Sequence, residues 1–313
     1  MVDIVECVPN FSEGRRRAVI DAVCRAAAGV PGVFVLDVSS DATHNRSVLT
    51  LAGPAAAVGE AAFAATRAAG ELINMEEHRG EHPRIGAMDV VPFVPAGDRT
   101  MADCVALARA VGGRIARELQ IPVYLYAEAT TRPERRRLAD IRRGEYEGLR
   151  RDVAAPGREP DFGPPRLHPT AGATAVGARP FLVAFNVDLD SRDLQAARAI
   201  AREVRESSGG LPKLQAIGIW ARGETAVQVS MNVLDFRVTS LAAALDAVAA
   251  AAARRGLAVL SSELVGLVPR AALPADPEKR LSIAGFDPAR QVFEERLERL
   301  GMAGGGPSGG ARS

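Results

Sequence analysis

The sequence predicts an α+β protein made of two units, each with the element order β-α-β-β-α-β. Three observations predict this class. Short apolar strands alternate with helices, the same order restarts after a proline- and glycine-rich stretch, and 313 residues suit about two domains. Hydrophobic residues make up 47% of the chain, which is enough for a buried core without disulfides. The order is that of the ferredoxin-like fold, present here twice.

The first half carries the longer set of elements. Ser12 is expected to cap the first helix, and Pro54 stands at the favoured first position of the second. Apolar residues at helical spacing support the first helix. The predicted strands cover residues 4–9, 33–38, 47–51, 89–94 and 123–127, and the predicted helices cover 12–28, 54–73, 101–119 and 133–143.

A stretch rich in proline and glycine, residues 154–177, separates the two halves. Such a composition predicts irregular extended structure and a domain boundary. After it, Ser191 is expected to cap one helix, and Gly256 ends another. The predicted strands there are 181–187, 215–220, 227–231 and either 259–260 or 264–268, and the predicted helices are 191–207 and 240–255. We therefore expect domains at 1–178 and 179–300, and a disordered glycine-rich tail at 301–313.

Charge and composition limit the partners of this protein. Lysine and arginine number 39 against 38 acidic residues, so the net charge is +1, and aromatic residues make up 4%. Nucleic-acid binders are typically strongly basic or offer aromatic rings for stacking. The chain has no apolar stretch of membrane-spanning length, no signal-peptide pattern and no CxxC pair among Cys7, Cys24 and Cys104. We expect a cytoplasmic protein that binds a small molecule and neither nucleic acid nor a membrane.

Histidine is scarce, and all four histidines lie in polar segments. Segment 78–89 contains two of them, and one can act as a general base, with Glu81, Arg84 and Asp89 available to orient it or to bind carboxylates. Two histidines four residues apart could also bind zinc on a helix, but Gly80 and Pro83 make a helix poor here. A loop whose polar groups only satisfy the backbone is the simpler alternative. The four histidines are His44, His78, His82 and His168.

Two other polar clusters and one basic segment are candidate sites. Residues 41–46 lie between two strands, and residues 10–14 end a strand at a helix N-terminus, where free N–H groups suit an anion. A turn and a helix cap explain these clusters equally well. The arginines of 132–151 alternate with acidic residues, which is typical of a solvated helix face, or of a basic rim for a polyanion. No phosphate-binding P-loop, dinucleotide or GxSxG hydrolase motif is present.

The chain resembles the formiminotransferase family between residues 4 and 269. The matching strings are long and unusual, for example IVECVPNFSEG from Ile4, HRGEHPRIGA from His78, and FLVAFN from Phe181. The resemblance implies transfer of a formimidoyl group between the amino group of glutamate and N5 of tetrahydrofolate, with tetrahydrofolate as co-substrate and no metal. It also implies two ferredoxin-like subdomains whose sheets face each other across a groove, with helices outside, and a homodimer.

The resemblance also assigns residues. The family's catalytic histidine matches His82, whose imidazole suits proton transfer in both directions. Asn10, His44, Arg46, Arg84 and Arg179 are hypothesised to bind the substrates, the arginines through carboxylates. The family's folate-binding stretch matches Gly163, Pro164, Pro165, Arg166, Leu167, His168, Pro169, Thr170, Ala171 and Gly172.

The chain departs from the animal members of the family. They carry a further cyclodeaminase domain, lack a histidine at His44, and have an aromatic residue before the glycine at Gly172. We therefore expect a stand-alone transferase. A missing aromatic ring removes a stacking surface for the pterin. Formyl transfer, a folate-binding module without catalysis, and a homologue that binds other ligands remain the alternatives.

Overall fold

The computed structural model describes residues 3–221 and 226–301 and divides the chain into two compact units. Unit 1 is Met1–Arg179 and unit 2 is Pro180–Ser313. Both contain helices and a sheet, so the class is mixed α and β with two separate sheets. Of the predicted disordered tail, residues 302–313 lie outside the described residues. No helix among the described residues is long and apolar enough to span a membrane.

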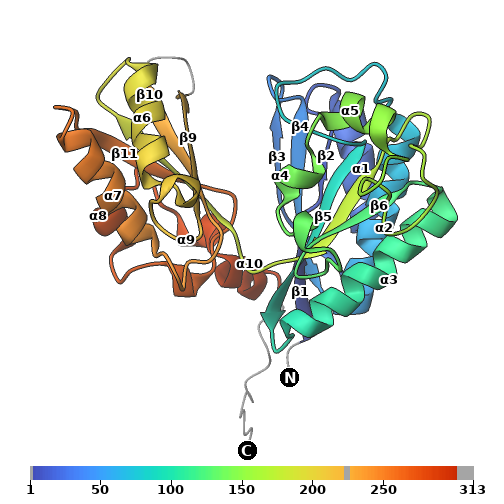
Figure 1. Cartoon of the computed structure of the whole chain (residues 1–313). Helices are drawn as coiled ribbons and strands as arrows, with labels where there is room; N and C mark the ends of the chain where they lie inside the picture. The colour runs from blue at the N-terminus through green and yellow to red at the C-terminus, as the bar shows by residue number, and fades with distance from the viewer. Residues whose placement is uncertain (1–2, 222–225, 302–313) are drawn as a thin grey trace, which may run out of the picture. The chain divides into compact units, whose positions relative to one another are not determined.

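Unit 1 is built on a seven-stranded sheet with the order β3–β4–β1/β2–β5–β7–β6 (Figure 1). β1 and β2 pair with the same two neighbours, so they act as one interrupted strand. β7 pairs in parallel with both β5 and β6. The strands are β1 Asp3–Cys7, β2 Asn10–Phe11, β3 Phe34–Asp41, β4 Arg46–Gly53, β5 Met88–Gly97, β6 Val123–Ala127 and β7 Thr174–Ala178.

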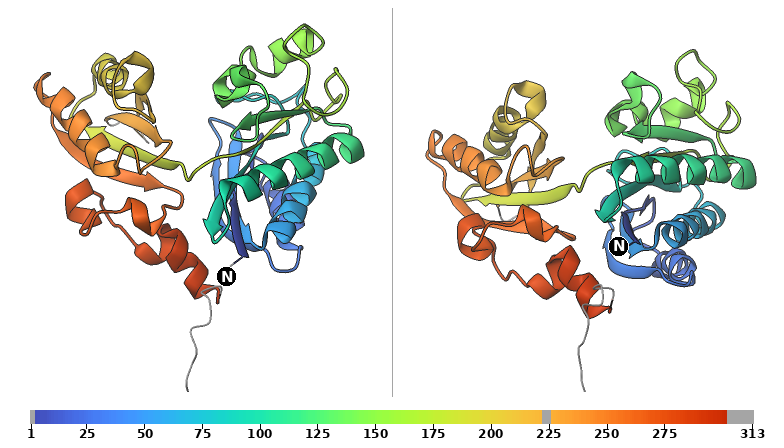
Figure 2. Two further views of the ribbon diagram at one scale, coloured as in Figure 1. Left: turned by 60° about the horizontal axis from the view of Figure 1, so that its bottom comes forward. Right: turned by 90° about the horizontal axis from the view of Figure 1, so that it is seen from below.

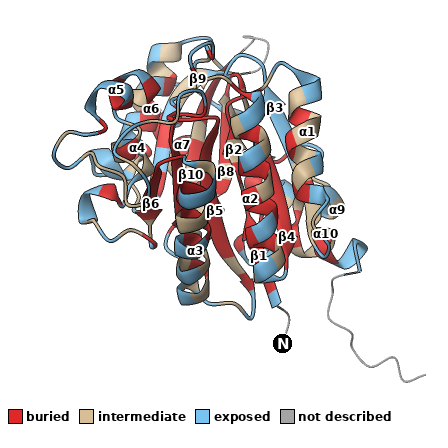
Figure 3. Ribbon diagram, turned by 90° about the vertical axis from the view of Figure 1, so that its right-hand side faces the viewer, coloured by how far each residue is buried: buried red, intermediate tan, exposed pale blue. Residues whose placement is uncertain are grey.

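Helices cover this sheet on both faces. The long helices pack on one face over the main core, in which Phe11, Phe63 and Phe93 are buried, and they show their exposed sides outward (Figure 3). α4 and α5 cover the other face over β5, β6 and β7, as parallel strands require. The helices are α1 Arg17–Ala28, α2 Ala55–Leu72, α3 Met101–Leu119, η1 Pro133–Arg135, α4 Leu138–Ile141 and α5 Glu145–Asp152.

Unit 2 has a four-stranded antiparallel sheet with the order β11–β8–β10–β9. α6 and α7 pack together on one face of it and enclose a second core (Figure 2). The strands are β8 Val183–Leu189, β9 Leu214–Trp220, β10 Val227–Val233 and β11 Val259–Val265. The helices are α6 Leu194–Val204, η2 Glu206–Ser208, α7 Leu241–Ala253, η3 Arg270–Ala272, α8 Pro277–Leu281, α9 Pro288–Gln291 and α10 Phe293–Arg299.

The prediction of irregular structure throughout 154–177 is wrong at its end. β7 begins at Thr174 and lies between β5 and β6 inside the sheet of unit 1. Its sequence, TAVGA, contains two β-branched residues and three small ones, so its intrinsic propensity to form a strand is weak. Burial on both faces, and not propensity, makes it a strand. The segment is therefore an integral part of unit 1.

Two predicted helix caps are also wrong. α1 begins only after Arg16, and the Ser12 hydroxyl donates instead to the carbonyl of Gly86 (2.7 Å). At α6 the cap is Asp193, whose carboxylate accepts from the N–H groups of the next turn, while Ser191 lies outside the helix. The predicted helix 133–143 is broken into η1 and α4, and α5 follows where none was predicted. By contrast, the helix 101–119 and the strand 123–127 are confirmed.

Candidate active site in unit 1

Backbone hydrogen bonds bring four of the polar segments singled out in the sequence together. The N–H of Ser12 donates to the carbonyl of Ala87 (2.8 Å), and the N–H of Ala87 donates to the carbonyl of Ala171 (2.8 Å). The N–H of Glu81 donates to the carbonyl of Thr43 (3.4 Å). The loop between α2 and β5, which carries His82, is thus the centre to which the other three are attached.

A close backbone contact sets the position of this loop. A Cβ at Gly80 would lie 2.3 Å from the carbonyl oxygen of His44, a separation that real side chains do not reach. Only glycine therefore lets the loop lie against the turn that precedes β4. One residue on, Asn45 accepts from the His78 ring through its carbonyl (Nε2 to O, 2.9 Å) and donates from its amide to the carbonyl of Arg79 (2.9 Å).

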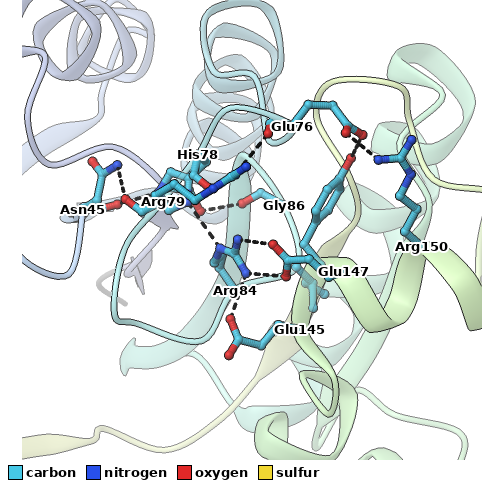
Figure 4. A network of polar contacts seen from close by, with 12 residues as sticks. Asn45, Glu76, His78, Arg79, Arg84, Gly86, Glu145, Glu147 and Arg150 are labelled. Atoms are coloured by element: carbon cyan, nitrogen blue, oxygen red, sulfur yellow. Dashed lines mark hydrogen bonds and ion pairs between the residues drawn. The ribbon is translucent and has the colours of Figure 1, made fainter.

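Arg84 anchors the same loop from its other side (Figure 4). Its guanidinium is buried, and it donates to the carboxylates of Glu145 (2.8 Å) and Glu147 (2.6 and 2.8 Å) on α5. Its Nε also donates to Nδ1 of His78 (3.3 Å), so the proton of that ring sits on Nε2. These contacts use most of the donors of Arg84, so its geometry favours a positioning role over a substrate contact.

The side chains that meet here line one small pocket. Four of the residues predicted to act in the site are among them: His44, Arg46, His82 and Arg84. The complete lining is Ser12, His44, Asn45, Arg46, His78, His82, Arg84 and Asp89.

The His82 imidazole lies in an unusually cationic, half-buried environment. Its Nδ1 is buried and has no hydrogen-bond partner in the described residues. Burial, followed by the positive charges of Arg46 and Arg142, lowers the pKa of His82 to about 3. The ring is therefore neutral at physiological pH in the free protein. The sequence alone predicts proton transfer in both directions by this imidazole, but the buried, cationic surroundings make the free ring a weaker base than an ordinary histidine.

Arg142 is a site residue that the sequence reasoning missed. Its guanidinium forms an ion pair with the buried carboxylate of Asp89, whose other oxygen accepts from the N–H of Ile85 (2.8 Å). The Nε of Arg142 is buried without a hydrogen-bond partner among the described residues. The nearest signal in the sequence was the run of arginines, which we interpreted as a solvated helix face.

That interpretation of 132–151 is wrong for two arginines. The side chain of Arg135 is only 5% exposed and pairs with Asp161 (2.7 Å), and that of Arg142 is 15% exposed. Both turn inward because α4 and α5 cover one face of the sheet. The free helix N-terminus expected after residue 14 is occupied as well, since the carboxylate of Glu13 accepts from the N–H groups of Arg15 and Arg16 (2.8 and 2.9 Å).

Arg46, which is partly buried, differs from the buried Arg84 and Arg135. Burial and the neighbouring Arg142 lower the pKa of Arg46 to about 10. Within the described ranges, no carboxylate forms an ion pair with it, and Asp89 and Asp41 support its charge only at longer range. An uncompensated cation beside a neutral imidazole is a site for an anionic group.

The remaining predicted site residues lie outside this pocket. Asn10 donates to the carbonyl of Val8 (2.8 Å) inside the sheet, and Arg179 lies against the buried ring of Tyr126. In the segment 163–172, the carbonyl and N–H of His168 pair with those of Gly172. The His168 Nδ1 accepts from the N–H of Ala171 (3.0 Å), so this ring organises the loop.

Nothing in the described ranges suggests a metal centre. No three histidine, cysteine or acidic side chains gather as metal ligands in residues 3–221 and 226–301. Both ring nitrogens of His78 are engaged by Asn45 and Arg84, so the zinc alternative loses one of its two ligands.

Comparison with known proteins identifies the family of this chain. Residues 4–179 match the formiminotransferase domain, N-terminal subdomain, and residues 184–277 match the formiminotransferase domain. The chain is 46% identical to a glutamate formimidoyltransferase of Streptococcus pyogenes, over 95% of this chain and 99% of that one. It is 44% identical to a glutamate formimidoyltransferase of Thermoplasma acidophilum, over 95% and 98%.

A longer relative is matched only in part. The formimidoyltransferase-cyclodeaminase of the mouse is 44% identical over 94% of this chain, which covers 60% of the mouse protein. The two family models together account for most of the described residues of both units. The chain belongs to the formiminotransferase family.

Proposed function

We propose that this protein is a glutamate formimidoyltransferase, which moves a formimidoyl group between N-formimidoyl-L-glutamate and N5 of tetrahydrofolate, as in histidine degradation. The observation that carries the proposal is its identity of 44–46% with two enzymes of that name over nearly their full length. The site supports it, because a neutral imidazole lies beside a cation without a carboxylate partner.

The reaction requires the net transfer of one proton from N5 of the folate to the nitrogen of glutamate. N5 attacks the carbon of the amidine, a C–N bond forms, and N5 loses its proton. The tetrahedral intermediate then breaks its bond to the glutamate nitrogen, which gains a proton and leaves as an amine. His82 takes the first proton as a base and returns one as an acid.

We infer that the substrates are held by predicted site residues other than Arg84. Arg46 has the free charge for a carboxylate, and His44 lies beside His82 with ring centroids 6.3 Å apart. Asn10, Arg179 and the segment 163–172 are proposed contacts of the folate, and the last is supported by its hydrogen bonds to the His82 loop. Tetrahydrofolate is the proposed co-substrate and no metal is required.

The wider organisation is also a proposal. The sheet order β11–β8–β10–β9 in unit 2, and β5–β1/β2–β4–β3 within unit 1, support two ferredoxin-like subdomains. The domain limits 1–178 and 179–300, the groove between the subdomains, the homodimer and the cytoplasmic location stay predictions.

A transfer assay tests the function directly. The purified protein is given tetrahydrofolate with N-formimidoyl-L-glutamate or with N-formyl-L-glutamate, and release of glutamate is measured. We expect release with the formimidoyl compound, and a fall of roughly 10²–10⁴-fold in turnover for His82→Gln. Arg254→Gln, which changes an exposed ion pair in unit 2, is the control and should retain full turnover.

Three results would contradict the proposal. Release only from the formyl compound would indicate formyl transfer. Folate binding without release from either compound would indicate a binding module. Failure to bind any reduced folate would indicate a homologue with other ligands.

A further inference from the structure

Two guanidinium groups near His82 have hydrogen-bonding capacity that is incompletely used: Arg46 lines the pocket, and Arg142 is paired with the pocket residue Asp89. Arg142 pairs with Asp89 through its Nη2 but leaves its Nε–H buried and without an acceptor. Arg46 has no ion pair among the residues described. Buried N–H donors of charged groups are rarely left without a partner, so an acceptor that comes with the ligand is the economical explanation.

Groups from several elements set the charge around His82. Arg46 on β4, Arg142 at the end of α4 and His44 in the turn before β4 face the ring from three elements. Asp89 on β5 is the only carboxylate that lines the pocket in the described part of the chain, and it is taken by Arg142. From the loop of His82 itself, Arg84 and His78 complete the lining, and Arg84 is neutralised by the glutamates of α5. Arg46 is therefore the arginine of this lining without an ion-pair partner among the described residues, and Asp41, which pairs with His44 (3.1 Å), supports its charge only at longer range.

On the basis of the proposed function, we propose that Arg142 and Arg46 together bind the α-carboxylate of the glutamate substrate beside His82. The nitrogen that exchanges the formimidoyl group is bonded to the same carbon as the α-carboxylate. A histidine that exchanges protons with this nitrogen must therefore have that carboxylate close by. The carboxylates of the folate tail are separated from N5 by the aminobenzoyl group, so they do not satisfy this requirement.

A carboxylate in this position also changes the chemistry of His82. The charges of Arg46 and Arg142 disfavour the protonated ring, and a bound anion offsets them. Burial is the larger cause and persists, so the pKa of His82 moves only part of the way back to its ordinary value. The acid/base group thus gains its working basicity only when the glutamate substrate is in place.

Calorimetric titration of the full chain with three probes tests this assignment. The probes are L-glutamate, 4-aminobutyrate, which lacks the α-carboxylate, and folic acid. For Arg142→Lys and Arg46→Lys we expect the affinity for L-glutamate to fall about ten-fold, the effect of one lost charged hydrogen bond. The affinities for the other two probes should not change.

Arg142→Lys keeps a cation beside Asp89, and Arg46→Lys removes no ion pair of the described residues, so both variants are expected to fold. Arg143→Lys is the matched control, because its side chain is 79% exposed and next in the chain. With ¹⁵N-histidine labelling, L-glutamate should also move the His82 ring signal towards the protonated form at pH 6 in the wild type, and less in Arg142→Lys.

Each outcome bears on one proposal. Unchanged glutamate affinity in both variants, with transfer activity present, overturns the carboxylate site and leaves the proposed function standing. Lost affinity for folic acid alone assigns the carboxylate to the folate and also overturns it. If the two variants lose affinity for L-glutamate but the wild-type protein shows no transfer activity, the result supports the carboxylate site and contradicts the proposed function.

Discussion

Single residues decide the position and the charge state of the candidate base. Gly80 lets the His82 loop touch the turn before β4, and Arg84 attaches the loop to α5. Arg46 and Arg142 then surround the ring with positive charge. The histidine is therefore held as a neutral imidazole, and its protonation becomes coupled to folding as well as to substrate.

A pH effect on stability follows from this coupling. The pKa of His82 is about 3 in the native state and near 6.5 in the unfolded chain, so between these values the unfolded state binds more protons. The free energy of unfolding should therefore fall as pH falls below 6.5, with up to about 1.4 kcal/mol per pH unit from this ring. Urea unfolding at pH 7, 6 and 5 should show a smaller loss in His82→Gln. Parallel losses in the two proteins would disprove the assignment.

Arg84 offers a second prediction at this scale. Arg84→Gln removes its charged hydrogen bonds to Glu145 and Glu147, whose side chains are about half exposed. We expect a loss of about 2 kcal/mol in unfolding free energy, reduced from the fully buried case by solvent screening. Arg254→Gln, which removes an exposed ion pair, should lower the free energy of unfolding by less than about 1 kcal/mol. Equal losses in the two variants would mean that the Arg84 network does not stabilise the loop.

At the scale of elements, the end of the segment 163–172 is fixed by backbone contact with the His82 loop. Gly172 has φ +72°, and a Cβ there would lie 2.5 Å from the carbonyl oxygen of Ile85. The proposed folate segment and the proposed base are therefore joined by a contact that only glycine permits.

Two glycine variants separate conformation from contact. Gly157 has φ +82°, but a Cβ there meets nothing within 4 Å. Gly157→Ala should therefore cost about 1 kcal/mol of unfolding free energy, for the left-handed backbone alone. Gly172→Ala should cost a further 1–3 kcal/mol or so for the overlap, measured by urea unfolding at one pH. Equal costs would show that the loop relaxes away from Ile85 freely.

At the scale of the whole molecule, each unit has its own core. Phe93 is buried in the main core of unit 1 and Phe185 in that of unit 2, and the two cores share no residue among those described. The only tryptophan, Trp220, lies on β9 of unit 2. Its fluorescence therefore reports on the sheet of unit 2.

This separation predicts selective unfolding. Phe185→Ala should lower the stability seen by Trp220 fluorescence by about 3–5 kcal/mol, the usual cost of removing a buried aromatic ring. Phe93→Ala should leave the fluorescence transition unchanged. It should lower the stability of unit 1, which is measured by amide hydrogen exchange. If both variants shift the fluorescence transition equally, the units unfold as one.

The sequence by itself determined the elements with strong local signals. The helix Met101–Leu119 carries a capping box between Thr100 and Asp103, and the strand Val123–Ala127 is a short apolar run, so both could be predicted from neighbouring residues. The resemblance likewise singled out His82 and the segment 163–172, because it lies in contiguous strings of sequence, and their roles stay predictions. Weak or competing local signals led to the wrong caps at Ser12 and Ser191.

Only the tertiary structure decided which charges surround the base. β7 has little propensity of its own and becomes a strand because two parallel neighbours bury it. That placement lets α4 and α5 cover the sheet, which turns Arg142 inward to Asp89 and towards His82. Burial and through-space charge bring Arg142 to Asp89, which is more than fifty positions away in the chain. No local sequence pattern encodes this contact. The pKa of His82 and the role proposed for Arg142 therefore come from the fold alone.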